Sequence, residues 1–202
     1  MSSQSSSEKN PAAKTPRLER GRARVAALLA AAAAVFAEKG YDAATMTEVA
    51  ARAGASIGSL YQFFPTKPLL AEALHLELLE KLTTLLEALG PRVAGQPAAA
   101  AMEHLFVGFG EFLEANPAFA SLAERRDIDK GRKAQTRALL RGLIAGLLTS
   151  AEPPLPRARA EAASVIVLHL IRAAVMLKES DEAPLREAAL AEMRRMLAAY
   201  FA

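Results

Sequence analysis

Apolar residues recur along most of the chain at the spacing of helices rather than strands. Between residues 17 and 39 they follow the i, i+3, i+4, i+7, i+11 pattern of one helix face, at Val25, Leu28, Leu29, Ala32 and Phe36. We expect this helix to stop at Gly40, because glycine adopts the left-handed conformation that commonly ends a helix. The segment up to Pro16 is rich in Ser, Lys and Pro and has little to bury, so we expect it to be disordered.

Two short helices are predicted next, with a glycine turn between them. Thr45-Met46-Thr47-Glu48 fits a capping box, which starts a helix that we expect to end at Gly54. Ser56 can cap a second helix over residues 57–64, and Pro65 stops it. Two short helices joined by a tight turn are typical of a helix-turn-helix.

The rest of the chain continues in helices separated by proline-containing breaks. Thr66 can cap a long helix that we expect to end near Leu89, because Gly90 and Pro91 follow it. Apolar stripes predict five more helices, over residues 98–115, 117–126, 130–150, 156–180 and 184–201. About nine helices and no strand pattern indicate an all-α fold. We divide it into a basic arm (1–16), a helix-turn-helix domain (17–67) and a helical body (68–202).

The composition supports the all-α class and excludes all functions that depend on cysteine. Apolar residues make up 52% of the chain but aromatic residues only 5%, so helix formers predominate. Cysteine is absent, which excludes disulfides, thiolate metal sites and a cysteine nucleophile. The net charge is +3, yet residues 1–24 alone hold six basic and two acidic residues, a charge of +4. Such an arm either attracts nucleic-acid phosphates or only keeps the chain soluble.

The basic start followed by apolar residues superficially resembles a secretory signal. The apolar residues there occupy one helix face with alanine elsewhere, whereas the core of a signal is apolar on all sides. No apolar run reaches the length of a membrane span. We therefore expect a cytoplasmic protein with no membrane association.

The second short helix has the pattern of a DNA-reading helix. Its first residues are short or polar, as the N-terminal positions of a helix in the major groove must be. Leu60 and Phe64 repeat at i, i+4 and should face the supporting helices, which directs Ser59, Gln62 and Phe63 outward. Gln62 can pair with an adenine edge, and Ile57 or Phe63 can touch a thymine methyl group. The alternative is that these side chains are only solvated surface.

Residues 36–70 also resemble the TetR family of bacterial transcription regulators. The resemblance extends over about residues 22–82 and is carried by Phe36, Gly40-Tyr41, the capped Thr45 to Ala50, Gly54, and Ser56 to Lys67 with its LYxxFPxK ending. It implies a three-helix DNA-binding head, a long fourth helix, and a ligand-binding, dimerising body, in a family composed mostly of repressors. The DNA-facing positions that it implies, taken with the helix pattern, are Thr45, Thr47, Ser56, Ile57, Gly58, Ser59, Tyr61, Gln62, Phe63, Thr66 and Lys67.

Within that set we expect Thr47, Tyr61, Thr66 and Lys67 to contact phosphates. The chain departs from the family at three positions. Ile57 stands where a basic residue is frequent and Phe63 where histidine is frequent, which favours apolar contacts there. Pro68 replaces a frequent acidic residue.

The predicted body helix 98–115 carries an aromatic stripe that is either plain core or the lining of a ligand pocket. The resemblance favours a pocket, which would suit a hydrophobic small-molecule effector. Candidate polar groups are histidines and arginines that could orient a ligand or lie solvated, among them His104 and Arg125. The candidate pocket residues are His75, Met102, Phe106, Phe109, Phe112, Phe119, His169 and Arg172.

No pattern in the sequence points to catalysis, a cofactor or a metal. Glu72 and His75 have the Glu-x-x-His spacing of di-metal bundles, but the second copy that such sites use is missing. There is no phosphate-binding loop and no nucleophile–base set. We expect no enzyme activity.

Apolar stripes on the last two long helices exceed what one partner helix buries. We expect a homodimer through a four-helix interface of residues 156–202 from each subunit. The resulting hypothesis is a transcription regulator that binds a palindromic double-stranded operator and is released by a small apolar effector. The alternatives are a non-specific architectural DNA-binding dimer and a helical small-molecule carrier or enzyme.

Overall fold

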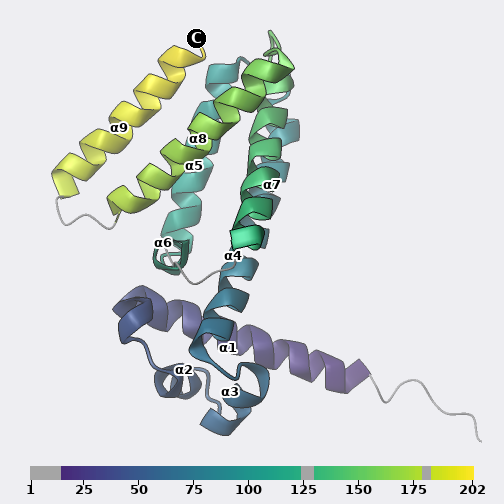
Figure 1. Ribbon diagram of the computed structural model, residues 1–202, viewed down its shortest axis with the longest axis vertical. Coiled ribbons are helices and arrows are strands. Elements are labelled where there is room, and N and C mark those ends of the chain that lie inside the picture. The colour runs from purple at the N-terminus through teal and green to yellow at the C-terminus, as the bar shows by residue number, and fades with distance from the viewer. Residues whose placement is uncertain (1–14, 124–129, 179–182) are drawn as a thin grey trace, which may run out of the picture. The chain divides into compact units, whose positions relative to one another are not determined.

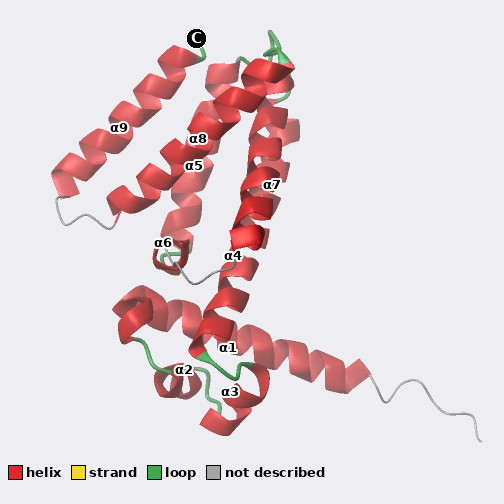
Figure 2. Cartoon of the chain, viewed as in Figure 1, coloured by secondary structure: helices red, strands yellow, loops and turns green. Residues whose placement is uncertain are grey.

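The computed structural model describes residues 15–123, 130–178 and 183–202, and these residues form helices and no strand (Figures 1 and 2). The all-α class is thereby confirmed. The described helices, nine as predicted, are α1 (Thr15–Ala43), α2 (Met46–Arg52), α3 (Ile57–Phe63), α4 (Lys67–Val93), α5 (Ala98–Ala115), α6 (Ala118–Ala123), α7 (Lys130–Thr149), α8 (Arg157–Lys178) and α9 (Ala183–Tyr200).

The chain divides into two compact units, Met1–Leu70 and Ala71–Ala202, which we call the head and the body. In the head, α2 contacts both α1 and α3. Neither α2 nor α3 exceeds 7 residues, a length at which an isolated helix is unstable in water. Their stability comes from a shared core in which Leu28, Phe36, Val49 and Leu60 are each at most 1% exposed.

The end of α1 agrees with the prediction in its backbone. Gly40 has φ 74° and ψ 165°, so the regular helix stops there although the helical assignment continues to Ala43. A positive φ costs glycine little, and it turns the chain toward α2. The helix starts at Thr15, two residues before the predicted start, while the rest of the predicted arm, residues 1–14, lies outside the described residues.

The predicted end of α4 near Leu89 is wrong. The helix continues through Gly90 and Pro91 to Val93. Pro91 lacks the amide that would donate to Glu87 O, yet the helix continues past it, and the Ala94 amide donates to Gly90 O at 3.1 Å. The chain turns instead at Gly95, whose φ is 73° and whose amide donates to Ser150 O at 2.9 Å.

In the body, α5 packs against α7, α8 and α9, and α8 contacts α6, α7 and α9 (Figure 1). The bounds of α5 match the prediction, those of α7 differ from it by one residue at the C-terminal end, and those of α9 by one residue at each end. Parts of two predicted helices, residues 124–126 and 179–180, lie outside the described residues. The aromatic stripe of α5 is in the core of the body, as expected for an apolar helix face.

Among the described residues, one helix segment is long and apolar enough to cross a membrane by composition alone. It is Arg157–Leu177 in α8, with a mean hydropathy of 1.8, and the apolar pattern of the sequence did not predict it. Of the apolar stretch within this segment, 44% is buried inside the protein. The core helices of proteins outside membranes are commonly as long and as apolar as this segment. This is weak evidence for a membrane span.

Candidate DNA-binding interface and the helical body

The turn between α2 and α3 is defined by hydrogen bonds that the sequence pattern predicts. Thr45 and Glu48 form the capping box, with the Glu48 amide donating to Thr45 Oγ1 at 3.3 Å and the Thr45 amide to Glu48 Oε2 at 2.9 Å. Gly54 then has φ 59°, and the Ala55 amide donates to Ala50 O at 2.9 Å. Ser56 caps α3 by accepting the Ser59 amide at 3.1 Å. The two helices therefore meet in a tight turn that these hydrogen bonds stabilise.

Helix α3 has a buried side and an open side. Leu60 is 0% exposed and Phe64, the residue after the helix, is 8% exposed, so both anchor it to the head, as predicted. On the open side, Tyr61 is 47% exposed and Ile57 and Phe63 are 39% exposed each. Gln62, Gly58 and Ser56 are exposed with them, whereas Ser59 is half-buried. We call the exposed side, Ser56 to Phe63 without Leu60, the reading face.

Several hydroxyl groups at the predicted DNA-facing positions also have structural roles. Ser56 and Thr66 accept backbone amides at the starts of α3 and α4, with Thr66 Oγ1 3.3 Å from the Leu69 amide, so their O–H groups remain able to donate. Thr45 differs, because its hydroxyl both accepts from Glu48 N and donates to Glu48 Oε2 at 2.9 Å. Thr47 is exposed and lies beside the capping box.

Two ion pairs hold α1 against α2. Lys39 pairs with Glu48, and Arg52 donates to Glu38 Oε2 at 2.5 Å. The hydrogen bond from Lys39, followed by those from Thr45, lowers the pKa of Glu48 from 4.5 to about 2. The hydrogen bond from Arg52 likewise lowers the pKa of Glu38. Both pairs are exposed to water, so they contribute to the orientation of α2 more than to stability.

Lys67 is placed differently from the other predicted DNA-contacting residues. It starts α4, yet its ammonium group turns back and donates to Asp42 O at 3.0 Å and Ala44 O at 2.8 Å. It also lies 4.5 Å from the centre of the Tyr41 ring. The side chain is half-buried, so the structure gives it partners inside the head.

In the body, the predicted pocket residues fall into two groups. Met102, Phe106, Phe109, Phe112 and Phe119 are at most 8% exposed. His75 of α4 stacks on Phe119 of α6 with ring centres 5.8 Å apart, and Phe119 meets Phe112 of α5 edge-on at 5.1 Å. Phe109 lies 6.2 Å from Phe112. His75, Phe109, Phe112 and Phe119 thus form one aromatic cluster joining α4, α5 and α6.

The structure does not bring the remaining candidates to that cluster. His169 and Arg172 are exposed on α8. His104 turns onto its own helix, with Nδ1 2.8 Å from Ala100 O, and Arg125 lies outside the described residues. Whether the cluster lines a pocket or is only core stays a prediction.

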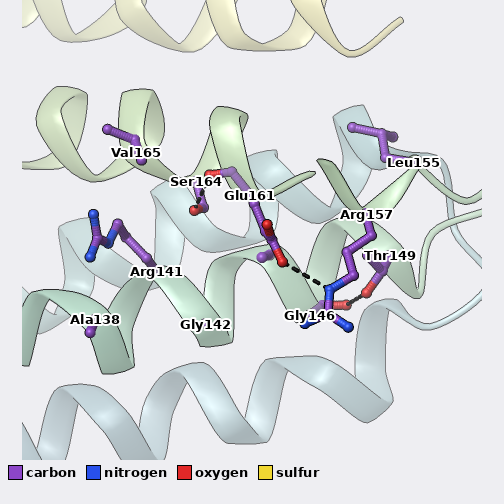
Figure 3. Close-up of a pocket in the computed structure, with 11 residues that line it drawn as sticks. Ala138, Arg141, Gly142, Gly146, Thr149, Leu155, Arg157, Glu161, Ser164 and Val165 are labelled. Atoms are coloured by element: carbon purple, nitrogen blue, oxygen red, sulfur yellow. Dashed lines mark hydrogen bonds and ion pairs between the residues drawn. The ribbon is translucent and has the colours of Figure 1, made fainter. Parts of the chain in front are cut away.

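A cavity of about 860 Å³ occurs elsewhere, between α7 and α8 (Figure 3). Small residues line its α7 side, and on the α8 side Arg157 donates to Glu161 Oε1 at 2.8 Å. Sequence reasoning missed this groove. The available signal is the i, i+4 row of small residues on one face of α7, at Ala138, Gly142 and Gly146.

Known proteins resemble this chain in two ways, in the sequence of most of the head and in the overall fold. Residues 28–74 match the family described as "Bacterial regulatory proteins, tetR family". No curated protein matches the chain. The matched stretch contains the capping box, the turn and the whole reading face.

Solved structures match over most of the chain. A TetR-family transcriptional regulator from Streptomyces coelicolor shares 26% identity, covering 88% of this chain and 96% of the other, with a TM-score of 0.61. A transcriptional regulator from Rhodococcus sp. has 21% identity over 88% and 95%, with a TM-score of 0.64. The regulator FadR from Bacillus subtilis, in complex with stearoyl-CoA, has 17% identity over 85% and 96%, with a TM-score of 0.60. The predicted resemblance is thus confirmed: residues 28–74 match the TetR family, and the chain has the fold of TetR-family transcriptional regulators.

Proposed function

We propose that this protein is a transcription regulator that binds a specific DNA sequence through the reading face of α3. The observation that carries the proposal is the exposure of Ile57, Tyr61, Gln62 and Phe63 on a helix whose opposite side is anchored by Leu60. A folded protein seldom leaves aromatic and apolar side chains grouped on a short exposed helix unless the group binds something. The TetR-family match covers the same residues.

The reading face has the chemistry of the major groove. The Gln62 amide can make two hydrogen bonds to an adenine edge, and Ile57 and Phe63 can contact thymine methyl groups. Tyr61 and Thr47 are exposed beside them and suit phosphates, as does the hydroxyl donor of Thr66. Thr45 fits less well, because its hydroxyl is already used in both directions within the capping box.

Sequence selection from a random duplex library tests the proposal. The wild-type chain should enrich one palindromic sequence and protect it in a footprint. Gln62→Ala should lose about 1–3 kcal/mol of discrimination at one base pair of each half-site. Binding of all duplexes alike, without a footprint, would instead identify an architectural DNA-binding protein. No DNA binding at all would favour a helical carrier.

A homodimer would place two heads on successive major grooves, about 34–36 Å apart. Large apolar side chains remain exposed on both C-terminal helices, among them Ile166 (55%) and Met176 (57%) on α8 and Leu185 (63%) and Met196 (59%) on α9. A second copy related by a two-fold axis can cover both rows at once. Ile166→Glu should convert the dimer to a monomer in light scattering, whereas a wild-type monomer at micromolar concentration would reject the dimer.

We further propose that the protein is a cytoplasmic repressor released by a small apolar effector. The aromatic cluster of α4, α5 and α6 offers an apolar environment with one titratable group, His75. Two neighbours of the same fold are connected with molecules that have a large apolar part. FadR is in complex with stearoyl-CoA, whose acyl chain is apolar, and KstR2 of Mycobacterium tuberculosis, at 20% identity, is described as a ketosteroid transcriptional regulator.

Titration with stearoyl-CoA and with a steroid tests this part. An effector must bind the released conformation more tightly than the DNA-bound one, so it must weaken DNA binding. If neither compound changes the affinity for the selected duplex, these two ligand classes are excluded. A reporter gene placed behind that duplex then decides whether the protein represses or activates.

A further inference from the structure

The ammonium group of Lys67 occupies the junction between the first two helices of the head. It donates to Asp42 O at 3.0 Å and to Ala44 O at 2.8 Å, which belong to the end of α1 and to the residue before the cap of α2. Both carbonyl groups lie beyond Gly40, where the regular part of α1 stops, so they belong to the connection between α1 and α2. Lys67 therefore places a positive charge from α4 on this connection.

The same ammonium group is also connected to the core of the head. It lies 4.5 Å from the centre of the Tyr41 ring, a cation–π distance. The Tyr41 ring meets Phe36 edge-on at 5.6 Å, and Phe36 is 1% exposed. Lys67 is therefore attached to the junction through two hydrogen bonds and to the core through one aromatic ring.

We propose that Lys67 is a positioning residue, which fixes the α1–α2 junction and thereby the orientation of the reading face, and is not a phosphate ligand. This rests on the DNA-binding function proposed above. An ammonium group has three N–H donors, and two of them are already used here. Its location differs from that of Thr47 and Tyr61, which are exposed and have room for a phosphate.

The effect on DNA reading follows from the order of the elements. Ala44 directly precedes Thr45, whose side chain caps α2, and α2 packs against α3. If the carbonyls of residues 42–44 lose their partner, the start of α2 can move and the reading face moves with it. The Lys39–Glu48 and Arg52–Glu38 pairs remain, so the head should stay folded without the ammonium group.

Lys67→Met removes the ammonium group and keeps most of the aliphatic chain, and Lys81→Met is the matched control on the same helix. Lys81 is exposed and pairs with Glu77 at 2.7 Å. Two quantities separate the roles. One is the ratio of affinities for the selected duplex and for a scrambled duplex of equal length. The other is the slope of log K against log salt concentration, which changes by about 0.9 for each phosphate that the protein ceases to neutralise.

For Lys67→Met we expect the affinity ratio to fall at least about fivefold, the lower limit for one misaligned base contact, with the salt slope unchanged. Lys81→Met should change neither quantity. A salt slope that becomes shallower by about 0.9 with an unchanged ratio would identify a phosphate ligand and overturn the proposal. Unchanged values of both quantities would reduce Lys67 to a structural residue and overturn it as well.

A measurement without DNA keeps this proposal separate from the function on which it rests. In the free wild-type protein, the ε-methylene protons of Lys67 should resonate upfield of those of Lys81, because they lie near the Tyr41 ring. If these signals coincide, the ring contact does not exist in solution and the proposal fails. If the wild type selects no duplex, the proposed DNA-binding function fails, and the positioning role fails with it even when the upfield shift is present.

Tyr41→Leu is the second variant and decides the case if Lys67→Met does not fold. It removes the ring beneath the ammonium group but leaves the charge of Lys67 available to DNA. A positioning role predicts a reduced affinity ratio with an unchanged salt slope. An unchanged ratio in this variant would contradict it.

Discussion

Leu60 and Phe63 lie on the same short helix, and their truncations should have opposite consequences. Leu60 is 0% exposed, and Leu60→Ala removes three carbon groups, worth about 2.4 kcal/mol at roughly 0.8 kcal/mol each. The cavity left behind adds to this, so we expect a loss of about 3 kcal/mol in head stability. Phe63 is 39% exposed, and Phe63→Ala should cost the fold less than about 1 kcal/mol.

Amide hydrogen exchange of Val49 measures the effect on the head itself, because this residue is buried in the neighbouring helix α2. Leu60→Ala should speed its exchange by about two orders of magnitude, the equivalent of about 3 kcal/mol. Phe63→Ala should leave the exchange nearly unchanged but weaken binding to the selected duplex. Equal exchange rates in the two variants would refute the assignment of a buried and a reading side to α3.

Two further predictions concern charge and backbone. The ion pair with Lys39 holds the pKa of Glu48 at about 2, below its ordinary 4.5, so its stabilising contribution is complete above pH 4.5 and is lost as the pH falls toward 2. Urea unfolding midpoints at pH 5 and pH 3 should therefore differ less in Glu48→Gln than in the wild type, and an equal difference would contradict this. Gly110→Ala, with no atom within 4 Å of the new Cβ, should raise the thermal stability of the body by about 0.5–1 kcal/mol. Gly40→Ala, at φ 74°, should lower stability, and a Gly110→Ala variant that is also destabilised would show that the glycine itself is required.

Local signals in the sequence predict the head almost completely. Thr45, Glu48 and Ser56 specify their caps through side chains that act within three residues, and Gly40 and Gly54 specify turns through their own backbone freedom. Such features depend little on distant parts of the chain. The predicted end of α4 is wrong because the helix continues past Gly90 and Pro91 and the chain turns only at Gly95, whose contact with Ser150 is distant in sequence.

In the candidate site, too, some features follow from local sequence and others from contacts between distant residues. The period of α3 predicts that Leu60 is buried and that Gln62 and Phe63 face outward, and the structure has them so, whereas Ser59, predicted to face outward with them, is half-buried. The partners of Lys67 could not be predicted, because Asp42 and Ala44 accept through their backbone carbonyls, which every residue possesses. In the body, the same period placed the aromatic stripe inside but could not indicate which helices would face it.

The sequence by itself thus determined the helical class, the caps, the glycine turns and the two sides of α3, since each depends on neighbours within a few residues. Only the tertiary structure decided that His75, Phe112 and Phe119 gather in one cluster while His169 and Arg172 stay outside it. It also decided that the ammonium group of Lys67 turns toward the α1–α2 junction. These outcomes depend on how helices distant in sequence pack, and a single helix period carries no information about its partner.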